Sequence, residues 1–304
     1  MTTEQSSKTE ADWRRAYRAL YRARAFDRTA LALQRQGVIE VFSEARGQEA
    51  ALIGACVDLV DDDMVFPDPR GAGVAMARGV TIGELFDWFR GMSYCPWDWR
   101  KTGYYAHPIP VGVQCSMAAG WAWAARLKQT DSVAVVYFGD GAASQGEVHE
   151  AMNYAGVFNA PVVFVLLNNG WAISTPSTRQ SKAEKISIRA AGYGFAGETV
   201  DGNDFEAVRA AARAAIEKAR SGGGPTLIEA ITYRMGGHTT SDDPKLYRSV
   251  EEMASWEERD PLKRQRETLL AAGHPEADID AVEVEVEEEI EASIDAYLEL
   301  RGLA

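Results

Sequence analysis

The strongest constraint on the fold is a pair of apolar segments near the middle of the chain, which predict two buried strands separated by a single helix. The segments 132–138 and 162–167 are apolar runs rich in β-branched side chains. Such runs are typical of strands that are buried on both faces of a parallel sheet. The segment between them carries an apolar stripe at helical spacing, and Ser144 with Glu147 three residues later predicts a capping box at its start.

The rest of the sequence continues this alternation of helix and strand. Two stretches rich in glycine and proline, 66–73 and 91–112, are predicted to be loops, and a loop as long as the second is more often functional than idle. Alternating strands and helices with short connections indicate an α/β fold with a doubly wound, mainly parallel sheet. The other expected elements are helices over 11–36, 47–59, 113–127 and 205–220 and a strand over 226–232.

The two ends of the chain are predicted to be helical additions to a single domain that spans 1–304. The N-terminal arm covers 1–36, and the C-terminal extension covers 262–304. The segment 278–295 holds nine acidic residues and neither Lys nor Arg, while its apolar residues recur at helical spacing. We interpret this segment as a surface helix whose acidic face is solvated.

Charge and cysteine content exclude several classes of protein. With 45 acidic and 32 basic side chains, the formal net charge is −13, which argues against a general nucleic-acid-binding protein. The three cysteines are far apart in the sequence, so neither a disulfide framework nor a zinc cluster is expected. A polar, acidic N-terminus and the lack of an apolar run of roughly 18 residues predict no signal peptide, no membrane span and a cytoplasmic location.

Polar side chains follow both buried strands at the point where each strand ends. Asp140 comes after the first strand, and Asn169 comes 29 residues later, after the second. This separation fits one strand–helix–strand crossover of ~30 residues, and ligands bind parallel sheets at the carboxyl ends of their strands. Carboxylate and amide oxygens suit Mg²⁺, which usually also binds phosphate oxygens. We therefore predict that Asp140 and Asn169 bind one magnesium ion.

The same edge of the sheet suits a phosphate group. Gly139 and Gly141 allow a tight turn and a close approach to the backbone, and the positive end of the following helix lies near Ser144. Either motif alone, Gly-Asp-Gly or Asn-Asn-Gly, is most often only a turn. Their occurrence together, one crossover apart and after two buried strands, favours a ligand site.

The paired motifs resemble the thiamine diphosphate motif, in which Gly-Asp-Gly is followed by Asn-Asn, here after 26 intervening residues. Over 47–261 the sequence is similar to alpha subunits of the decarboxylating component of 2-oxo acid dehydrogenase complexes. The block at 233–248 is closest to the branched-chain members, and bacterial pyruvate-type alpha subunits are also similar. The blocks that carry the resemblance are YFGDGAASQG at 137–146, NNGWAISTP at 168–176, VDGND at 200–204 and YRMGGHTTSDDPKLYR at 233–248.

Position by position, this resemblance implies a set of cofactor contacts. Asp140, the side chain of Asn169 and the backbone carbonyl of Trp171 would bind Mg²⁺. Arg70 would bind the diphosphate of thiamine diphosphate. His238, the one expected catalytic residue, would reach the diphosphate and the mouth of the active site. The other implied cofactor contacts are Val111, through its backbone to the aminopyrimidine, and Gly139, Gly141 and Ala142 along the diphosphate.

The sequence departs from the family pattern at five positions, one of which is Thr239, which stands where animal enzymes carry a phosphorylatable serine. Pro69 stands where relatives commonly have a tyrosine before the arginine, so one phosphate contact is expected to be missing. Leu167 replaces a residue that is often polar or charged. Pro108 and Val113 stand where some branched-chain enzymes have hydroxyl residues that bind K⁺, so a potassium site is not expected.

Other features of the second glycine- and proline-rich stretch are less specific. His107 lies within it, and either a structural or a functional role fits this position. Its aromatic side chains favour core or subunit contacts over stacking on a cofactor: Trp97, Trp99, Tyr104 and Tyr105.

The resemblance implies an enzyme that decarboxylates a 2-oxo acid, with a branched-chain 2-oxo acid favoured over pyruvate, and transfers the acyl group to a lipoyl acyltransferase component. In related single-chain enzymes, the glutamate that activates the cofactor comes from a separate pyrimidine-binding domain, which needs on the order of 150 residues. Only 138 residues precede Gly139. We therefore expect a beta subunit, in an alpha2beta2 heterotetramer, and neither turnover nor tight cofactor binding by this chain alone.

Two alternatives remain open from the sequence. One is a two-subunit thiamine diphosphate enzyme of different chemistry, such as an acetoin dehydrogenase or a carboligase. The other is a non-catalytic cofactor-binding subunit, which Pro69 and Leu167 would suit. The sequence does not identify the 2-oxo acid, because the pocket for its side chain is shared with the partner subunit.

Overall fold

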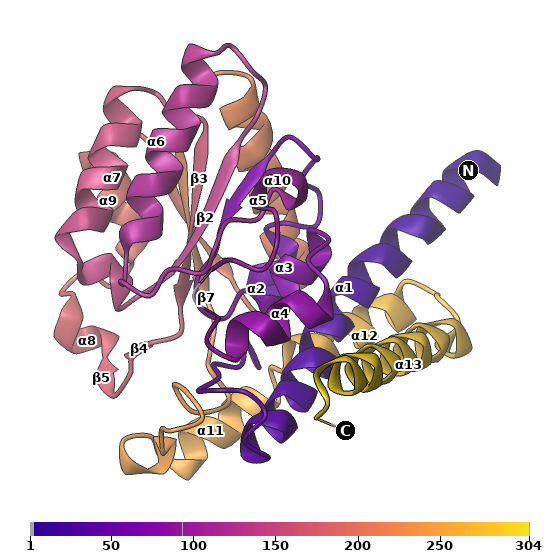
Figure 1. Cartoon of the computed structure of the whole chain (residues 1–304). Helices are drawn as coiled ribbons and strands as arrows, with labels where there is room; N and C mark the ends of the chain where they lie inside the picture. The colour runs from indigo at the N-terminus through magenta and orange to yellow at the C-terminus, as the bar shows by residue number, and fades with distance from the viewer. Residues whose placement is uncertain (1–2, 93, 304) are drawn as a thin grey trace.

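A five-stranded sheet forms the centre of the computed structural model, which describes residues 3–92 and 94–303, with side chains from residue 11 onward. The strand order is β1-β2-β3-β7-β6, and all neighbouring strands run parallel (Figure 1). This arrangement confirms the predicted α/β fold with a parallel sheet. The strands are β1 (Met64–Phe66), β2 (Ala134–Gly139), β3 (Val162–Asn168), β6 (Ala196–Asp201) and β7 (Thr226–Ile231), and a separate antiparallel pair consists of β4 (Trp171–Ala172) and β5 (Thr175–Pro176).

Helices cover both faces of the sheet, because successive side chains of each strand point to opposite faces. One face, which includes Val135 and Val165, shares a core with α1 (Thr3–Arg35), α2 (Glu49–Gly54) and α10 (Phe205–Arg220). The opposite face, which includes Val136 and Phe164, shares a second core with α6 (Val113–Leu127) and α7 (Gly146–Val157). The remaining helices are α3 (Ala72–Ala77), α4 (Ile82–Phe89), α5 (Trp99–Thr102), α8 (Ser177–Gln180), α9 (Arg189–Gly192), α11 (Val250–Glu257), α12 (Pro261–Ala271) and α13 (Glu276–Arg301), with 3₁₀ turns η1 (Ala142–Ser144), η2 (Ile186–Ile188) and η3 (Pro244–Leu246).

Most expected elements appear, with several differences. The expected helix over 47–59 is shorter, because α2 ends at Gly54, and the expected loop 66–73 contains the last residue of β1 and the start of α3. The expected loop 91–112 contains the short helix α5. The predicted capping box is wrong: η1 comes between β2 and α7, so Gln145 occupies the N-cap and makes no side-chain hydrogen bond there.

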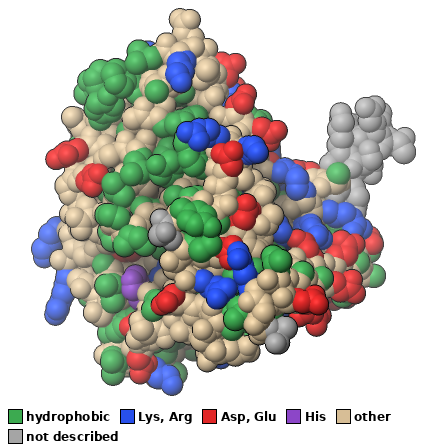
Figure 2. All heavy atoms as spheres, in the orientation of Figure 1, with side chains coloured by type: hydrophobic (Ala, Val, Ile, Leu, Met, Phe, Trp, Pro, Cys, Tyr) green, Lys and Arg blue, Asp and Glu red, His purple; other side chains and the backbone are tan. Residues whose placement is uncertain are grey.

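The acidic C-terminal helix does not present a simply solvated face. The apolar stripe of α13 is buried, as the spacing predicts, and α13 packs along α1 (Figure 1). Glu289 accepts from both Arg18 and Arg22 of α1, at 2.5 and 2.6 Å. Positive and negative side chains therefore gather over α1 and α13 (Figure 2). The solvated interpretation is corrected, because arginines from the other end of the chain neutralise much of the acidic face.

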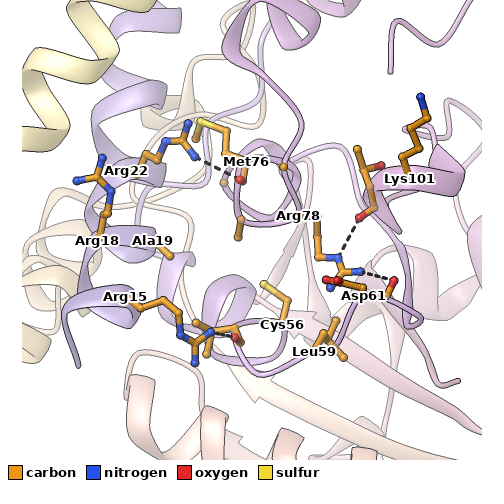
Figure 3. Close-up of a pocket in the computed structure, with 15 residues that line it drawn as sticks. Arg15, Arg18, Ala19, Arg22, Cys56, Leu59, Asp61, Met76, Arg78 and Lys101 are labelled. Atoms are coloured by element: carbon orange, nitrogen blue, oxygen red, sulfur yellow. Dashed lines mark hydrogen bonds between the residues drawn. The ribbon is translucent and has the colours of Figure 1, made fainter. Parts of the chain in front are cut away.

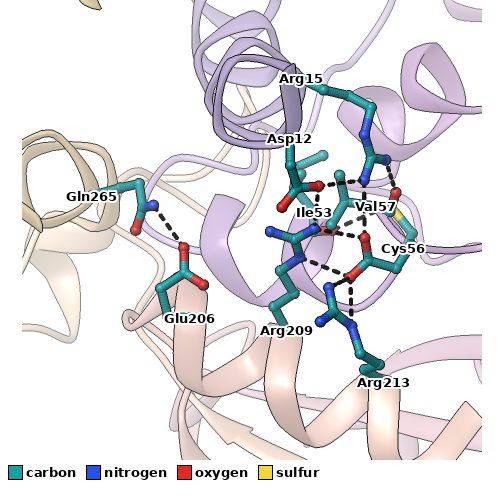
Figure 4. A network of polar contacts seen from close by, with 10 residues as sticks. Asp12, Arg15, Ile53, Cys56, Val57, Glu206, Arg209, Arg213 and Gln265 are labelled. Atoms are coloured by element: carbon teal, nitrogen blue, oxygen red, sulfur yellow. Dashed lines mark hydrogen bonds and ion pairs between the residues drawn. The ribbon is translucent and has the colours of Figure 1, made fainter. Parts of the chain in front are cut away.

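A second charged cluster fastens α1 to the helices that cover the sheet (Figure 4). Asp58, which follows α2, accepts from Arg209 and Arg213 of α10 at 2.7 Å and from Arg15 of α1 at 3.0 Å. Asp12 of α1 also accepts from Arg209, at 2.7 Å. Burial alone would raise the pKa of Asp58, but the hydrogen bonds from the three arginines outweigh burial and hold the pKa below its usual range.

We expect Asp58→Asn to lower the free energy of unfolding by about 2 kcal/mol, because three guanidinium groups lose a charged, half-buried partner. Urea unfolding monitored by circular dichroism measures this loss. Arg213→Met is the matched control, since the Arg213 side chain is 62% exposed and its removal leaves Asp58 with two arginines. A loss as large in the control as in Asp58→Asn would contradict the central role of Asp58.

Membrane insertion through a helix finds no support in the described part of the chain. None of its helices combines the length and the apolar character that crossing a bilayer requires.

Candidate functional site

A cavity of about 490 Å³ opens at the carboxyl ends of β2 and β3. The two strands are in register, with Gly139 opposite Leu167, so the residues that follow them emerge at the same edge of the sheet. The structure therefore brings together every residue for which the sequence predicts a site role. The residues that line the cavity include Arg70, Val111, Gly139, Asp140, Gly141, Ala142, Asn169, Trp171 and His238.

Asp140 is an almost fully buried carboxylate at the floor of this cavity, with 2% of its surface exposed. Its Oδ2 accepts from Gln180 Nε2 at 3.1 Å, and no ion pair to it occurs among the described residues. Burial raises the pKa of Asp140 to about 6, although the hydrogen bond from Gln180 opposes this shift. A buried carboxylate without a cationic partner is costly, so the position favours a bound cation.

The amide of Asn169 is oriented by its neighbours. Its Nδ2 donates to Gln48 Oε1 at 3.1 Å, and its Oδ1 accepts from the backbone N–H of Trp171 at 3.2 Å. These partners assign the oxygen and the nitrogen of the amide. Within the described residues, no group of three or more His, Cys, Asp or Glu side chains is arranged to hold a metal. A metal at this edge would therefore rely on one carboxylate together with amide and backbone oxygens.

Two buried arginines line the cavity without a carboxylate partner among the described residues. Arg70 donates to the backbone carbonyls of Glu44 and His238, at 2.6 and 2.7 Å, and burial lowers its pKa to about 10. Arg234 donates to the carbonyl of Ile173 at 3.0 Å, and its buried Nε has no hydrogen-bond partner within the described part of the chain. Two guanidinium groups that form no ion pair among the described residues suit an anionic ligand.

His238 lies beside Arg70 and is held in its neutral form. Burial, followed by the charges of Arg70 and Arg234, lowers the pKa of His238 to about 4. Its Nδ1 is 3.3 Å from Nη2 of Arg70, which can only donate, so we assign the proton of the neutral ring to Nε2. His238 can therefore offer one N–H donor near neutral pH.

Two glycines bring backbone segments close together beside the cavity. A Cβ on Gly141 would lie 2.8 Å from Cβ of Ala172, so no side chain fits between these segments. Gly112 has φ of +95° and directly precedes α6, and Val111, the residue before it, lines the cavity. The tight turns around the predicted contacts therefore depend on glycine at these positions.

Several residues that line the cavity are not expected from the sequence, notably Arg234, Gln114 and Ile173. Arg234 follows β7 without any local pattern, and its approach to the cavity depends on how the chain leaves the sheet. Gln114 is buried, donates to Tyr137 and keeps Oε1 without a partner among the described residues. Ile173 has φ of +55°, which is strained for a β-branched residue and is typical of functional sites.

The weaker candidates of the sequence lie outside this cavity. His107 is buried and is surrounded by the rings of Trp88, Phe89, Trp97 and Tyr104. Its Nε2 is 2.8 Å from the Tyr104 hydroxyl, which donates to the carbonyl of Gly71 at 2.8 Å. His107 therefore donates through Nε2. Trp97 and Tyr104 are buried in a core, which confirms the preference for packing over cofactor stacking.

The buried ring of His107 predicts a pH-dependent loss of stability. Burial lowers the pKa of His107 from 6.5 to about 4, so the unfolded chain binds a proton that the folded chain refuses. The neutral His107 ring therefore contributes fully to the free energy of unfolding above pH 6.5. As pH falls toward 4, the free energy of unfolding should decrease by roughly 3 kcal/mol. His107→Gln keeps an N–H donor but does not titrate, so the difference in unfolding free energy between wild type and variant should narrow or reverse over this range. Urea unfolding at pH 7 and at pH 4.5 tests this, and a constant difference would contradict it.

A second cavity, of about 460 Å³, shares no lining residue with the first (Figure 3). Basic side chains of α1 face it from one side, and Arg78 and Lys101 lie on the other (Figure 3). Arg78 donates to the backbone carbonyls of Val60, Asp63 and Thr102 at 3.0 to 3.1 Å. Most donors of this arginine are therefore used in bonds within the protein itself.

The same chain is similar to known proteins over nearly its whole length. Residues 17–299 match the family of dehydrogenase E1 components. The alpha subunit of 3-methyl-2-oxobutanoate dehydrogenase from Mycobacterium tuberculosis is 44% identical over 257 residues, covering 84% of this chain and 70% of that protein. The alpha subunit of the pyruvate dehydrogenase E1 component from Acholeplasma laidlawii is 37% identical over 279 residues, covering 91% and 80%.

A human relative extends the comparison to mitochondrial proteins. The alpha subunit of human 2-oxoisovalerate dehydrogenase is 36% identical over 267 residues, which cover 84% of this chain and 60% of the human protein. The match to the family model includes both strand ends that form the cavity as well as the segments that carry Arg70 and His238. The chain therefore belongs to the family of dehydrogenase E1 components.

Proposed function

We propose that this chain is the alpha subunit of a branched-chain 2-oxo acid dehydrogenase, which works with a beta subunit and passes the acyl group to a lipoyl acyltransferase. The family depends on thiamine diphosphate. The observation that carries the proposal is the meeting, in one cavity, of a buried carboxylate and two buried guanidinium groups without ion-pair partners among the described residues. Such a site suits a diphosphate that is bound together with a divalent cation.

The residues of the cavity fit this cofactor. Asp140, Oδ1 of Asn169 and the carbonyl of Trp171 would hold Mg²⁺, and Arg70 would bind the diphosphate. The buried Oε1 of Gln114, which has no partner in the described residues, offers an acceptor to a ligand group that donates. When bound, thiamine diphosphate supplies the electron sink for breaking the bond between the carboxylate and the carbonyl carbon of the 2-oxo acid.

His238 would assist as a neutral donor at the mouth of the site. With its proton assigned to Nε2, the ring can donate to an oxygen of the diphosphate or of the substrate without adding a charge. The backbone N–H of His238 donates to Asp242 Oδ2 at 2.6 Å, and the hydroxyl of Tyr247 donates to the same oxygen at 2.5 Å. These bonds hold the loop that carries His238 beside Arg70.

A partner chain is supported by apolar side chains at the cavity. Ile109, Val111 and Ile173 all line it, and they are 83%, 59% and 54% exposed. Apolar side chains gathered at the mouth of a polar site are typical of a protein–protein contact. We propose that the beta subunit covers this surface and completes the active site in an alpha2beta2 heterotetramer.

The substrate preference rests on the comparison with relatives. The 44% identical relative is named for 3-methyl-2-oxobutanoate, and the 37% identical relative is named for pyruvate. We propose a branched-chain 2-oxo acid as substrate on this basis.

Co-production of this chain with its beta subunit tests the proposal. The purified complex is assayed for reduction of an artificial electron acceptor with 3-methyl-2-oxobutanoate, pyruvate and acetoin, in the presence of thiamine diphosphate and Mg²⁺. We expect the highest kcat/KM with 3-methyl-2-oxobutanoate and no turnover by this chain alone. Preference for acetoin, or turnover without the beta subunit, would overturn the proposal, and cofactor binding without any turnover would indicate a non-catalytic subunit.

A further inference from the structure

A buried carboxylate lies directly behind the turn that carries the proposed metal ligands. Glu229, in the middle of β7, has no exposed surface and no ion pair among the described residues. Its Oε1 accepts from Nδ2 of Asn168 at 2.8 Å. Its Oε2 accepts from the backbone N–H of Ser187 at 2.9 Å and from the hydroxyl of Thr199 at 3.3 Å. Glu229 therefore connects β3, η2 and β6 through a single carboxylate.

Because Glu229 is an acid, it can accept all three of these hydrogen bonds. A carboxylate accepts on both oxygens and donates on neither, so it can satisfy three donors from three segments. A glutamine of the same shape has only one accepting oxygen, and its amide nitrogen would face another donor. Burial of a charge without a cationic partner does not favour stability. The arrangement is therefore suited to fixing orientation rather than to stabilising the fold.

The bond to Glu229 orients the amide of Asn168. Because Nδ2 donates to the carboxylate, Oδ1 points the other way and accepts from the backbone N–H of Gly170 at 3.2 Å. A flipped amide would place its oxygen against the carboxylate and its nitrogen against the N–H of Gly170. Glu229 thus holds the turn from Asn168 to Gly170 in one conformation, in which Gly170 has φ of +80°.

This turn places two of the three proposed metal ligands. Asn169 lies within it, and Trp171 follows it directly. We propose that Glu229 is a positioning residue, which acts through Asn168 to aim the side chain of Asn169 and the carbonyl of Trp171 at the metal. This inference rests on the proposed function, because it assumes that the cavity binds Mg²⁺ with thiamine diphosphate.

A polarity swap tests the proposal in the complex of this chain with its beta subunit. Glu229→Gln sets its amide nitrogen against the donor of Asn168 or of Ser187. In the double variant Glu229→Gln with Asn168→Asp, the new amide can donate to the new carboxylate, while its oxygen still accepts from Ser187. Outer partners of metal ligands typically alter metal affinity 10- to 100-fold, so we expect about that loss of Mg²⁺ affinity in Glu229→Gln and recovery to within about threefold in the double variant.

Calorimetric titration of Mg²⁺, with thiamine diphosphate present, measures these affinities. We expect kcat at saturating Mg²⁺ to change much less than the Mg²⁺ concentration needed for half-maximal activity. Thr199→Val is the matched control, because it removes a donor to the same carboxylate without touching Asn168. We expect it to leave Mg²⁺ affinity within about twofold of wild type, since the bond that orients the turn remains.

A second readout does not depend on the metal. Hydrogen exchange in the metal-free complex should quicken at the amides of Gly170 and Trp171 in Glu229→Gln and return toward wild type in the double variant. Unchanged exchange, unchanged Mg²⁺ affinity in Glu229→Gln, or a double variant no better than Glu229→Gln would overturn the positioning role. A wild-type complex that binds neither Mg²⁺ nor thiamine diphosphate would instead overturn the proposed function, and with it this inference.

Discussion

Asp140→Asn is expected to abolish metal-dependent cofactor binding while making the metal-free chain more stable. The carboxylate is the only charged ligand proposed for Mg²⁺, so its replacement should lower kcat/KM of the complex by at least about 100-fold. The opposite effect on stability follows from the pKa of Asp140, which burial raises from 3.8 to about 6. At pH 7.5 the wild-type chain holds this buried carboxylate ionised, and an asparagine removes that cost, which is on the order of 2–3 kcal/mol.

The gain in stability from Asp140→Asn is expected to depend on pH. Because folding raises the pKa of Asp140, the protonated carboxyl adds to the free energy of unfolding below pH 3.8. This contribution is lost as pH rises through about 6. The advantage of Asp140→Asn should therefore be largest above pH 7 and should shrink toward pH 4. Urea unfolding of the metal-free chain at pH 7.5 and pH 4.5, together with calorimetric titration of cofactor and Mg²⁺ into the complex, measures both effects. A destabilised variant, or one that still binds the cofactor with wild-type affinity, would contradict the metal role.

Arg70→Met should weaken binding of thiamine diphosphate far more than binding of thiamine. A buried, charge-assisted contact to a phosphate is worth about 2–3 kcal/mol, which corresponds to a loss of affinity of roughly 30- to 150-fold. Thiamine lacks the diphosphate, so its weak binding should change by less than about threefold. The comparison separates a phosphate contact from a general disturbance, because Arg70 also holds the backbone carbonyls of Glu44 and His238.

Arg70→Lys is the matched variant for this experiment. It keeps the charge but loses the planar fork that reaches both carbonyls, so we expect an intermediate affinity for thiamine diphosphate. Fluorescence titration of the complex with both ligands, at saturating Mg²⁺, gives the two dissociation constants. Equal losses for thiamine and thiamine diphosphate in Arg70→Met would show that Arg70 organises the loop and does not bind the diphosphate.

The parts of the fold that sequence reasoning predicted are those whose pattern is set by burial. The strands β2 and β3 lie at the centre of the sheet and are apolar on both faces, and the boundaries of α6 and α10 agree with the predicted helices. The strands β1 and β6 were missed because both lie at the edges of the sheet. β1 has only three residues, and the side chains of β6 are exposed or half-buried, so neither shows a continuous apolar run.

The candidate site shows the same division between local and long-range information. Asp140 and Asn169 could be found because parallel strands in register end at one edge, which converts a spacing in the sequence into a spatial neighbourhood. Arg234, Gln48 and Glu229 could not be found in this way. Their roles depend on contacts with residues 61 to 121 positions away, for which the sequence has no local signal.

The ion pairs between α1 and α13 also bear on the order in which the chain acquires its structure. Arg18 and Tyr17 bind acidic residues 266 to 271 positions later, so the contact between α1 and α13 cannot form until α13 has been synthesised. At synthesis rates of ~5–20 residues per second, the first helix waits on the order of tens of seconds for its partner. During that time, the side chains of α1 that bind α13 lack these partners, whereas those that pack on α2 and α3 do not depend on α13. Synthesis of α13 is therefore the step that allows these ion pairs to join the two helices.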